Sequence, residues 1–283
     1  MTDIIEQFGQ STIQHGPHSN RAYLMSLAAD DLPRLVPYLD QLAQEQAYTK
    51  VFAKVPEAAL EPFRQSGYEA EAEIPEFYRG EEHVYFMGKY FCPERQQEQK
   101  PDLVESALQA AQSRQGHQAD LALPDAMTCR LAEPADALAM ADVYRQVFAT
   151  YPFPIHDPGY LRETMESHVD YLGIWDKDQL VALASAEKDV RGQNAEMTDF
   201  ATLPDYRGQG LAGHLLERLE EVAAERGIQT AYTIARAYSY GMNITFARGG
   251  YTYSGTLTFF QAGAMNCAPT CYFIRVDAAV RVV

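Results

Sequence analysis

Asp199-Phe-Ala-Thr-Leu-Pro-Asp-Tyr-Arg-Gly-Gln-Gly-Leu-Ala212 is the stretch that decides the fold, and a helix-forming run follows it directly up to Arg226. Its pattern is typical of a strand, a glycine-spaced turn and an amphipathic helix. Gly208 and Gly210 let the backbone approach a bulky anion closely. The first turn of the helix presents N–H groups without intrahelical partners, and Arg207 adds a positive charge. The stretch therefore predicts a site that binds a pyrophosphate.

Two classes of nucleotide-binding fold place glycines at this spacing. The three glycines at 208, 210 and 213 fit GxGxxG, but a dinucleotide-binding fold needs an acidic residue about twenty positions on, at the end of a second strand. Here the region 225–229 is typical of helix and loop, and Pro204 and Asp205 loosen the turn. The RxxGxA spacing from Arg207 to Ala212 instead resembles the acetyl-CoA signature of the GNAT N-acetyltransferases.

The composition of the whole chain narrows the classes of function. With 283 residues, of which 47% are hydrophobic, the chain is long enough for two domains with their own cores. Its net charge of −16 argues against nucleic acid or an anionic membrane as a general partner, because both need a basic surface. A small cationic substrate suits this charge. The sequence does not decide the oligomeric state and leaves a homodimer open.

Targeting and cysteine patterns point to an intracellular enzyme without a metal. Residues 1–10 are acidic and contain no apolar run typical of a signal peptide, and no later stretch is long enough to span a bilayer. We therefore expect a cytoplasmic protein. The four cysteines, Cys92, Cys129, Cys267 and Cys271, have no histidines at zinc spacing, so we expect reduced thiols and no metal.

The element pattern divides the chain into two α/β parts. We expect an N-terminal tail over residues 1–20, a small α/β domain over 21–92, a polar helical connector over 93–127 and a larger α/β domain over 128–283. Asp30 is the candidate N-cap of the first helix. Residues 63–68 (Phe-Arg-Gln-Ser-Gly-Tyr) parallel residues 246–251 (Phe-Ala-Arg-Gly-Gly-Tyr). The small domain is thus predicted to be a partial copy of the larger one without the glycine turn, although such a junction is also common in unrelated folds.

Five blocks resemble one family in particular, the β-lysine N-acetyltransferases of the GNAT superfamily. They are Tyr48 to Pro56, Glu73 to Gly80, Tyr151 to Pro158, Ala195 to Thr202 and Ser239 to Ala247. The resemblance implies a GNAT fold of α/β (α+β) class, with a mixed, mostly antiparallel twisted sheet flanked by helices. It also implies acetyl-CoA as co-substrate and acetylation of the ε-amine of β-lysine to make a compatible solute. Residues 262–271 depart from the family pattern, which leaves the acceptor open.

Acetyl transfer to an amine needs a neutral nitrogen, and a carboxylate is the natural base. A lysine-like amine has a pKa near 10.4, so only about one molecule in a few thousand is neutral at pH 7. Glu196 is the leading candidate, because its distance in sequence from Arg207 resembles that of the catalytic glutamate of histone acetyltransferases. Asp199 is the second candidate. Regular strand alternation puts Glu196 and Asp199 on opposite faces, so both face the substrate only if a bulge intervenes, as the resemblance implies. Either carboxylate is otherwise a solvated strand residue.

The resemblance also implies a set of residues that contact acetyl-CoA. The backbone N–H groups of Ala201, Thr202 and Leu203 would hold the pantetheine arm. Arg207, Gly208, Gln209, Gly210, Leu211 and Ala212 would hold the phosphates, and Asn243 and Phe246 would contact the cofactor from a second helix. Phe246 stands where many GNAT enzymes have a tyrosine that protonates the leaving thiolate. Tyr240 and Tyr251 lie near it in sequence and are expected to pack rather than to act as acids.

The acceptor pocket is expected at the loop from Tyr151 to Pro158. Tyr151, Phe153 and the neighbouring prolines would form a rigid apolar wall for a methylene chain, although the loop also reads as a plain connector between helices. Glu187 has two interpretations, a residue that helps to bind a cation and a side chain that is simply solvated. Histidines 83, 156, 168 and 214 show no catalytic pattern, so we expect them to be structural.

Two alternatives to β-lysine acetylation remain open at the level of sequence. The acceptor of a GNAT enzyme could be another small amine, an amino acid or a peptide N-terminus. The missing tyrosine at position 246 also fits a non-catalytic sensor that binds acyl-CoA without turnover.

Overall fold

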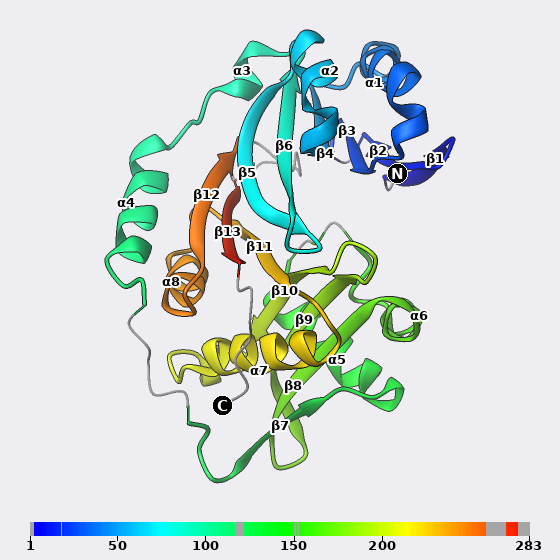
Figure 1. Ribbon diagram of the computed structural model, residues 1–283. Helices are drawn as coiled ribbons and strands as arrows, with labels where there is room; N and C mark the ends of the chain where they lie inside the picture. The colour runs from blue at the N-terminus through cyan, green and yellow to red at the C-terminus, as the bar shows by residue number, and fades with distance from the viewer. Residues whose placement is uncertain are drawn as a thin grey trace. The chain divides into compact units, whose positions relative to one another are not determined.

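Two compact units make up the chain in the computed structural model, which describes residues 3–17, 19–116, 122–149, 151 and 153–258, and the backbone of 270–276 (Figure 1). The first unit comprises the described residues within Met1–Ala110, Ala235–Asn243 and Tyr253–Phe273. The second comprises those within Ala111–Ile234, Ile244–Thr252 and Ile274–Val283. The chain therefore returns to its first unit after building most of its second.

The first unit is a mixed sheet with helices packed against it. Its strands are β1 (Ile4–Phe8), β2 (Ser11–Gly16), β3 (Arg21–Ser26), β4 (Lys50–Pro56), β5 (Glu69–Tyr78), β6 (Glu82–Tyr90) and β12 (Thr252–Leu257). They are ordered β1-β2-β3-β4-β6-β5-β12, and only β3 and β4 pair in parallel. The helices are α1 (Leu32–Glu45), α2 (Leu60–Gln65), α3 (Pro93–Gln96) and α4 (Pro101–Gln112), with short 3-10 turns Ala29–Asp31 and Glu57–Ala59.

Residues 4–16 correct the expectation of an N-terminal tail. β1 and β2 form an antiparallel hairpin in which Ile4 lies opposite His15 and Phe8 opposite Ser11. Its second strand is buried, because Ile13 has no exposed surface and packs into the core under α1. The sequence indicates this hairpin only weakly, since its first strand carries polar side chains and two exposed isoleucines.

Asp31, and not Asp30, holds the start of the first helix. Its carboxylate accepts hydrogen bonds from the backbone of Gln10 (2.8 Å) and from the backbone and hydroxyl of Ser11 (2.9 and 2.8 Å). The bond from the Ser11 hydroxyl is the main cause that lowers the pKa of Asp31. The predicted N-cap is therefore wrong by one residue, because the acidic side chain is used to fasten the hairpin rather than to cap the helix.

The second unit contains the predicted mixed, mostly antiparallel sheet flanked by helices. Its strands are β7 (Met127–Leu131), β8 (Val169–Asp176), β9 (Gln179–Asp189), β10 (Asn194–Thr202) and β11 (Thr230–Arg236), in this order across the sheet. Only β10 and β11 pair in parallel. The helices are α5 (Ala137–Val147), α6 (Pro158–Ser167) and α7 (Leu211–Glu225), with 3-10 turns Pro134–Asp136 and Pro204–Tyr206. The helix α8 (Tyr240–Arg248) and the strand β13 (Thr270–Val276) are divided between the two units.

The boundary expected at residue 128 differs from the observed division at both ends. The second unit already begins at Ala111, within the expected connector, and β7 starts at Met127. Near the C-terminus β12 pairs with β5 of the first unit, with Gly255 opposite Ala72. A side chain at Gly255 would collide with β5, because its Cβ would lie 2.3 Å from the carbonyl oxygen of Glu71. This long-range pairing is invisible in local sequence patterns.

The two junctions that the sequence paired have the same local geometry. Tyr68 N–H donates to Phe63 O (3.1 Å), and Tyr251 N–H donates to Phe246 O (3.0 Å). The glycine before each tyrosine has a left-handed φ, +82° at Gly67 and +86° at Gly250. The order β3-α1-β4-α2 also repeats as β10-α7-β11-α8, with a parallel strand pair in each case. These repeats support the interpretation that the first unit is a partial copy of the second.

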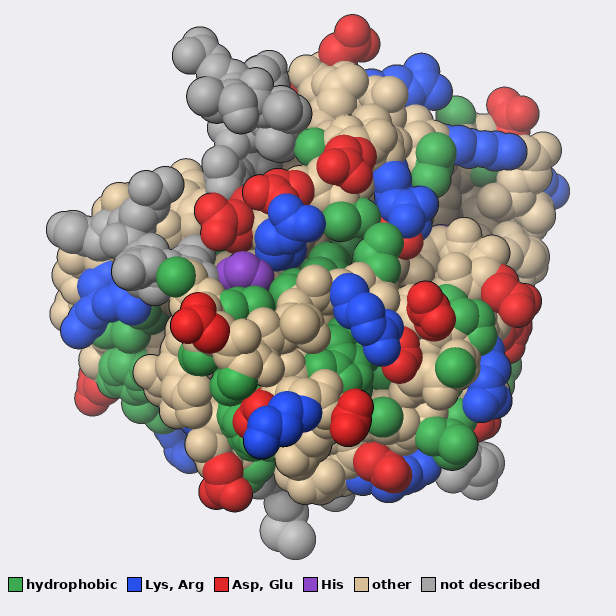
Figure 2. Space-filling view, turned by 90° about the horizontal axis from the view of Figure 1, so that it is seen from below, with side chains coloured by type: hydrophobic (Ala, Val, Ile, Leu, Met, Phe, Trp, Pro, Cys, Tyr) green, Lys and Arg blue, Asp and Glu red, His purple; other side chains and the backbone are tan. Residues whose placement is uncertain are grey.

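The described surface and the described cysteines show no feature specific to one function. On the face shown in Figure 2, Lys and Arg side chains are interspersed with Asp and Glu, so the described residues of that face form no basic patch. No helix among the described residues is long and apolar enough to cross a membrane. Cys92 and Cys129 are free thiols. Cys267 and the side chain of Cys271 lie outside the described part of the chain, as do residues 262–269.

A buried ion pair closes the first unit. The ammonium of Lys50 has no exposed surface and donates to both oxygens of Glu71 (2.8 and 2.7 Å), to the hydroxyl of Tyr90 (2.9 Å) and to Thr258 O (3.0 Å). Burial lowers the pKa of Lys50 to about 8, although Glu71 opposes this shift. The pair thus ties β4, β5 and β6 to the segment that returns after β12.

We expect Glu71→Gln to lower the free energy of unfolding at pH 7 by about 3 kcal/mol, because it leaves a buried ammonium without its counter-ion. Urea denaturation measures this change. Glu69→Gln, which changes an exposed residue of the same strand, is the matched control and should change stability by less than about 0.5 kcal/mol. A loss for Glu71→Gln as small as that of the control would contradict a stabilising role for the pair.

Candidate active site

A β-bulge in β10 brings the predicted carboxylates to one face of the second unit. Thr198 lies opposite Ser185 of β9, but the next paired residue, Ala201, lies opposite Leu183, so β10 contains one extra residue. Asp199 sits in the bulge with a left-handed φ of +55°. Glu196 lies opposite Glu187, two residues along β9 from Ser185, and so shares the face of Thr198. The predicted bulge is present.

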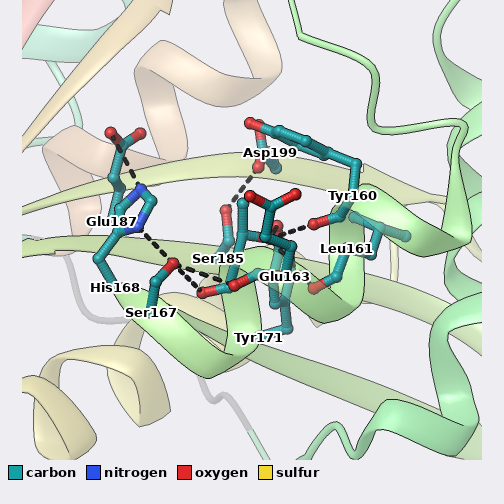
Figure 3. Close-up of polar contacts among 10 residues, drawn as sticks. Tyr160, Leu161, Glu163, Ser167, His168, Tyr171, Ser185, Glu187 and Asp199 are labelled. Carbon is teal, nitrogen blue, oxygen red and sulfur yellow. Dashed lines mark hydrogen bonds and ion pairs between the residues drawn. The ribbon is translucent and has the colours of Figure 1, made fainter.

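Asp199 is held by hydroxyl donors on both of its oxygens. Tyr151 donates its phenolic O–H to Oδ1. Ser185 donates its hydroxyl to Oδ2 at 2.7 Å, as Figure 3 shows. The Tyr151 hydroxyl also lies 3.5 Å from the hydroxyl of Thr198. Part of the residue remains accessible, but burial raises the pKa of the Asp199 carboxyl, while the bonds from Tyr151 and Ser185 oppose that rise. Asp199 is thus an enclosed carboxylate whose pKa lies above its ordinary value.

Tyrosines crowd this carboxylate. Burial is the largest cause that raises the pKa values of Tyr144, Tyr151, Tyr160 and Tyr171, and the charge of Asp199 contributes to the rise in all four. Tyr144 on α5 has no exposed surface, and its hydroxyl has no hydrogen-bond partner among the described residues. These phenols are therefore neutral, and they offer polar edges next to an apolar wall. Of the four, only Tyr151 was expected in the site.

In the predicted pocket loop from Tyr151 to Pro158, Tyr151 makes the main contact with the site. The ring of Tyr151 packs against Phe148 in a tilted arrangement, with a ring-centroid distance of 5.0 Å, and Phe153 packs against the core under α5 and α6. Pro152 lies outside the described residues. The loop therefore supplies one polar contact to Asp199 and an aromatic wall, which agrees with a pocket rather than with a plain connector.

Glu187 and Glu196 form a second acidic group on the same face. The two residues are directly opposite each other in β9 and β10, an arrangement that like charges disfavour unless a cation lies between them or near them. The charge of Glu187 also raises the pKa of Asp199. His168 lies close by, with Nε2 at 3.8 Å from Glu187 Oε1. This contact was missed in the sequence, because His168 ends a helix and Glu187 lies in a strand nineteen positions later.

The glycine turn has the backbone conformation that the sequence predicts. Gly208 has a φ of +80°, and Gly210, at the N-cap of α7, has a φ of +77°. A Cβ on Gly208 would meet no atom of the described residues within 4 Å, so the space beside it is open in this part of the chain. The exposed side chain of Arg207 donates from Nε to Thr202 O at 3.2 Å.

The amides of this turn precede the first hydrogen bonds of α7. Gly213 N–H and His214 N–H both donate to Gly210 O, at 3.0 and 3.1 Å. Leu211 and Ala212 therefore lie in the part of the first turn that has no intrahelical acceptor, next to the exposed Gln209. An exposed helix start after two left-handed glycines fits a pyrophosphate.

β10 and β11 pair only at their beginnings. Asn194, Ala195 and Glu196 pair with Thr230, Ala231 and Tyr232, and no further pair joins these two strands in the described chain (Figure 1). Beyond Glu196, the β11-facing edge of β10 therefore offers backbone groups to a ligand.

Two of the three predicted amide contacts need correction. Leu203 N–H already donates to Val181 O at 3.0 Å, and strand alternation gives Ala201 the same direction, toward β9. Thr202 N–H points to the other edge and is the amide of the three that remains suited to hold an extended ligand.

Asn243 and Phe246 are both buried in α8. The amide of Asn243 donates to the carbonyls of Arg236, Ala237 and Ser239, at 3.1, 3.2 and 2.7 Å, so it fixes the turn before the helix. Phe246 is 1% exposed and packs edge-on against Phe200 (5.4 Å) and Tyr251 (5.2 Å). Their contact with a cofactor remains a prediction, and the structure gives both a role in packing.

The comparisons with known proteins agree with this geometry. The sequence profile of the Acetyltransferase (GNAT) family matches residues 139–241, which contain the bulge and the glycine turn. A β-lysine N(6)-acetyltransferase of Methanococcus maripaludis is 37% identical over 256 residues, which are 90% of this chain and 92% of that relative. The chain belongs to this family of GNAT acetyltransferases. It is therefore an acyltransferase, and the alternative of a non-catalytic sensor loses its support.

Two further relatives match about half of the chain. A β-lysine N(6)-acetyltransferase of Methanosarcina mazei is 43% identical over 135 residues, 48% of this chain and 50% of the relative. The N-acetyltransferase YodP of Bacillus subtilis is 40% identical over 147 residues, 51% of this chain and 54% of the relative. The GNAT acetyltransferase family thus accounts for the fold of the second unit.

We expect Asp199→Asn to stabilise the fold at neutral pH. Asparagine tolerates the left-handed conformation and keeps hydrogen bonds to Tyr151 and Ser185, but it carries no charge. The pKa of Asp199 is higher in the folded chain than its ordinary 3.8, so the folded state binds a proton more tightly than the unfolded state does. The stability of the unsubstituted protein therefore falls as the pH rises from the ordinary pKa through the folded-state pKa.

Urea denaturation between pH 4.5 and pH 7.5 tests this expectation. The advantage of Asp199→Asn should grow with pH, and Asp205→Asn, which removes an exposed carboxylate, should show no such growth. A variant less stable than the unsubstituted protein at every pH would show that the Asp199 carboxylate stabilises the fold.

Proposed function

We propose that this chain transfers the acetyl group of acetyl-CoA to the ε-amine of β-lysine. The observation that carries the proposal is the convergence of Glu187, Glu196 and Asp199 on one face of the second unit, where a dicationic amine finds counter-charges. The names of two relatives, in Methanococcus maripaludis and Methanosarcina mazei, support β-lysine as the acceptor. The net charge of −16 favours the approach of a cation.

The residues of the glycine turn fit acetyl-CoA, the donor that GNAT acetyltransferases use. Arg207 and the amides from Gly208 to Ala212 would hold the phosphates, and Thr202 N–H would hold the pantetheine arm. Bound acetyl-CoA would supply the thioester that the amine attacks. The open space beside Gly208 agrees with a ligand that approaches the backbone there.

Asp199 is the carboxylate best suited to take the proton from the ammonium. A base works best when its pKa lies near the working pH, and burial moves the pKa of Asp199 in that direction. Tyr151, Ser185 and Thr198 donate three hydrogen bonds to the carboxylate, whose two oxygens together have four lone pairs, so it can still accept a further hydrogen bond. The sequence favoured Glu196 as the base, and the geometry moves our proposal to Asp199.

Glu196 and Glu187 would then hold the second ammonium of the acceptor. Two carboxylates that face each other across neighbouring strands repel when nothing neutralises them, so a cation gains from both. The wall formed by Tyr151 and Phe153 would pack along the methylene chain between the two nitrogens. In this arrangement both nitrogens of the acceptor lie next to carboxylates.

A panel of amines tests the acceptor. With CoA release as the readout, we expect kcat/KM to be highest for β-lysine and lower for lysine, spermidine and 6-aminohexanoate. Glu187→Gln should lower kcat/KM for β-lysine by about three- to fivefold, the size of a partly exposed ion pair, and leave 6-aminohexanoate nearly unchanged. Equal activity with lysine or spermidine would contradict the assignment of β-lysine.

Two substitutions of glycine test the phosphate turn. Gly208→Asn and Gly227→Asn both place a side chain at a left-handed residue with open space around it, at the two ends of α7. Asparagine tolerates this conformation, so both variants should fold. We expect Gly208→Asn to raise KM for acetyl-CoA about tenfold, because its Cβ enters the space left for the phosphates. If both variants bind acetyl-CoA as the unsubstituted chain does, the turn does not hold the cofactor.

A further inference from the structure

His168 stands between the end of α6 and the acidic pair of the acceptor site. Its backbone N–H closes the helix on Thr164 O (3.1 Å), and its carbonyl accepts from Lys188 N–H (2.9 Å), next to Glu187 in β9. The ring is turned toward Glu187, with Nε2 at 3.8 Å from Oε1 (Figure 3). Both side chains are about half exposed, 47% and 42%, so both reach water and a ligand.

Hydrogen bonding orients the His168 ring with Nε2 toward Glu187. The hydroxyl of Ser167 lies within hydrogen-bond distance of two carbonyls of its own helix, Glu163 O at 3.1 Å and Thr164 O at 3.2 Å. The same hydroxyl lies 2.8 Å from His168 Nδ1, and which of the two atoms donates depends on the tautomer of the ring. In the protonated ring both nitrogens carry N–H groups, so Nε2 presents a positive N–H to Glu187, whereas the neutral ring brings no charge to this carboxylate.

The surroundings of Glu187 are acidic or phenolic. Glu196 faces it from β10, and Glu187 contributes to the raised pKa values of Asp199, Tyr160 and Tyr171. Glu163 lies on α6, and its charge acts on Tyr160. Lys188 points to the other side, where it pairs with Asp170 at 2.7 Å. Among these groups, His168 is the one that can supply a positive charge to Glu187.

We propose that His168 determines acceptor specificity by competing with the second ammonium of the acceptor for Glu187. When the ring is protonated, it neutralises Glu187, and a diammonium acceptor loses a partner. When the ring is neutral, it brings no positive charge to Glu187 and leaves that carboxylate to the acceptor. The inference rests on the proposed function and predicts that the preference for diammonium over monoammonium acceptors rises with pH.

The ratio of kcat/KM for β-lysine to that for 6-aminohexanoate measures this preference. Both acceptors present the same reacting amine, so the titration of Asp199 affects both and cancels in the ratio. From pH 5.5 to pH 8 the ratio should rise about three- to fivefold, the size of a partly exposed ion pair, through a fall in KM for β-lysine. In His168→Gln the ratio should be high at every pH, and kcat at saturation should stay unchanged. In Glu187→Gln it should be low at every pH.

His83→Gln is the matched control, because His83 also pairs with a glutamate, Glu73 at 3.2 Å, but lies in the first unit. It should keep the pH dependence of the unsubstituted enzyme. A ratio that does not change with pH, or that rises in His168→Gln as in the unsubstituted enzyme, overturns the role of His168 and leaves the proposed function intact. Failure to acetylate β-lysine at any pH overturns the proposed function and this inference with it.

Discussion

The single extra residue in β10 is the constraint on which the site depends. Without it, strand alternation would place Asp199 on the face opposite Glu196, and the carboxylates would not share a substrate. The bulge costs free energy, because a non-glycine residue in the left-handed region is strained by about 1 kcal/mol or more. Tyr151 and Ser185 offset this cost by holding both oxygens of Asp199. Strain and burial are thus concentrated at the residue that we propose as the base.

Buried charge is handled differently in the two units. In the first unit, Lys50 and Glu71 neutralise each other and bind Tyr90 and Thr258 O, so the charge is internally satisfied. In the second unit, Asp199 has hydroxyl partners but no cationic partner among the described residues, and the charge of Glu187 raises its pKa further. The first arrangement stabilises the fold and the second prepares a site for an external cation. This difference agrees with a catalytic second unit and a supporting first unit.

Local sequence patterns predicted the elements whose structure is determined by interactions between residues close in the chain. The apolar stripe of α7 and the glycines at 208 and 210 gave the strand, turn and helix correctly, because periodicity and positive φ leave a clear signature. The bulge was predicted only through resemblance, since no residue type marks it. The hairpin at 4–16, the pairing of Gly255 with β5 and the contact between His168 and Glu187 depend on residues far apart in the chain. The sequence indicated Asp30 as the N-cap, because it does not show the long-range hydrogen bond from Ser11 to Asp31.

The central claim is that the bulge delivers Asp199 as the base, with Glu196 binding the acceptor. Single-turnover acetyl transfer to β-lysine, followed over pH at saturating acetyl-CoA and amine, separates these roles for Asp199→Asn and Glu196→Gln. We expect Asp199→Asn to lower the rate about a hundredfold or more and to remove its acid limb, while Glu196→Gln keeps the limb and nearly the full rate at saturation and instead raises the amine concentration needed to saturate. The opposite result, an acid limb lost in Glu196→Gln and kept in Asp199→Asn, would contradict it.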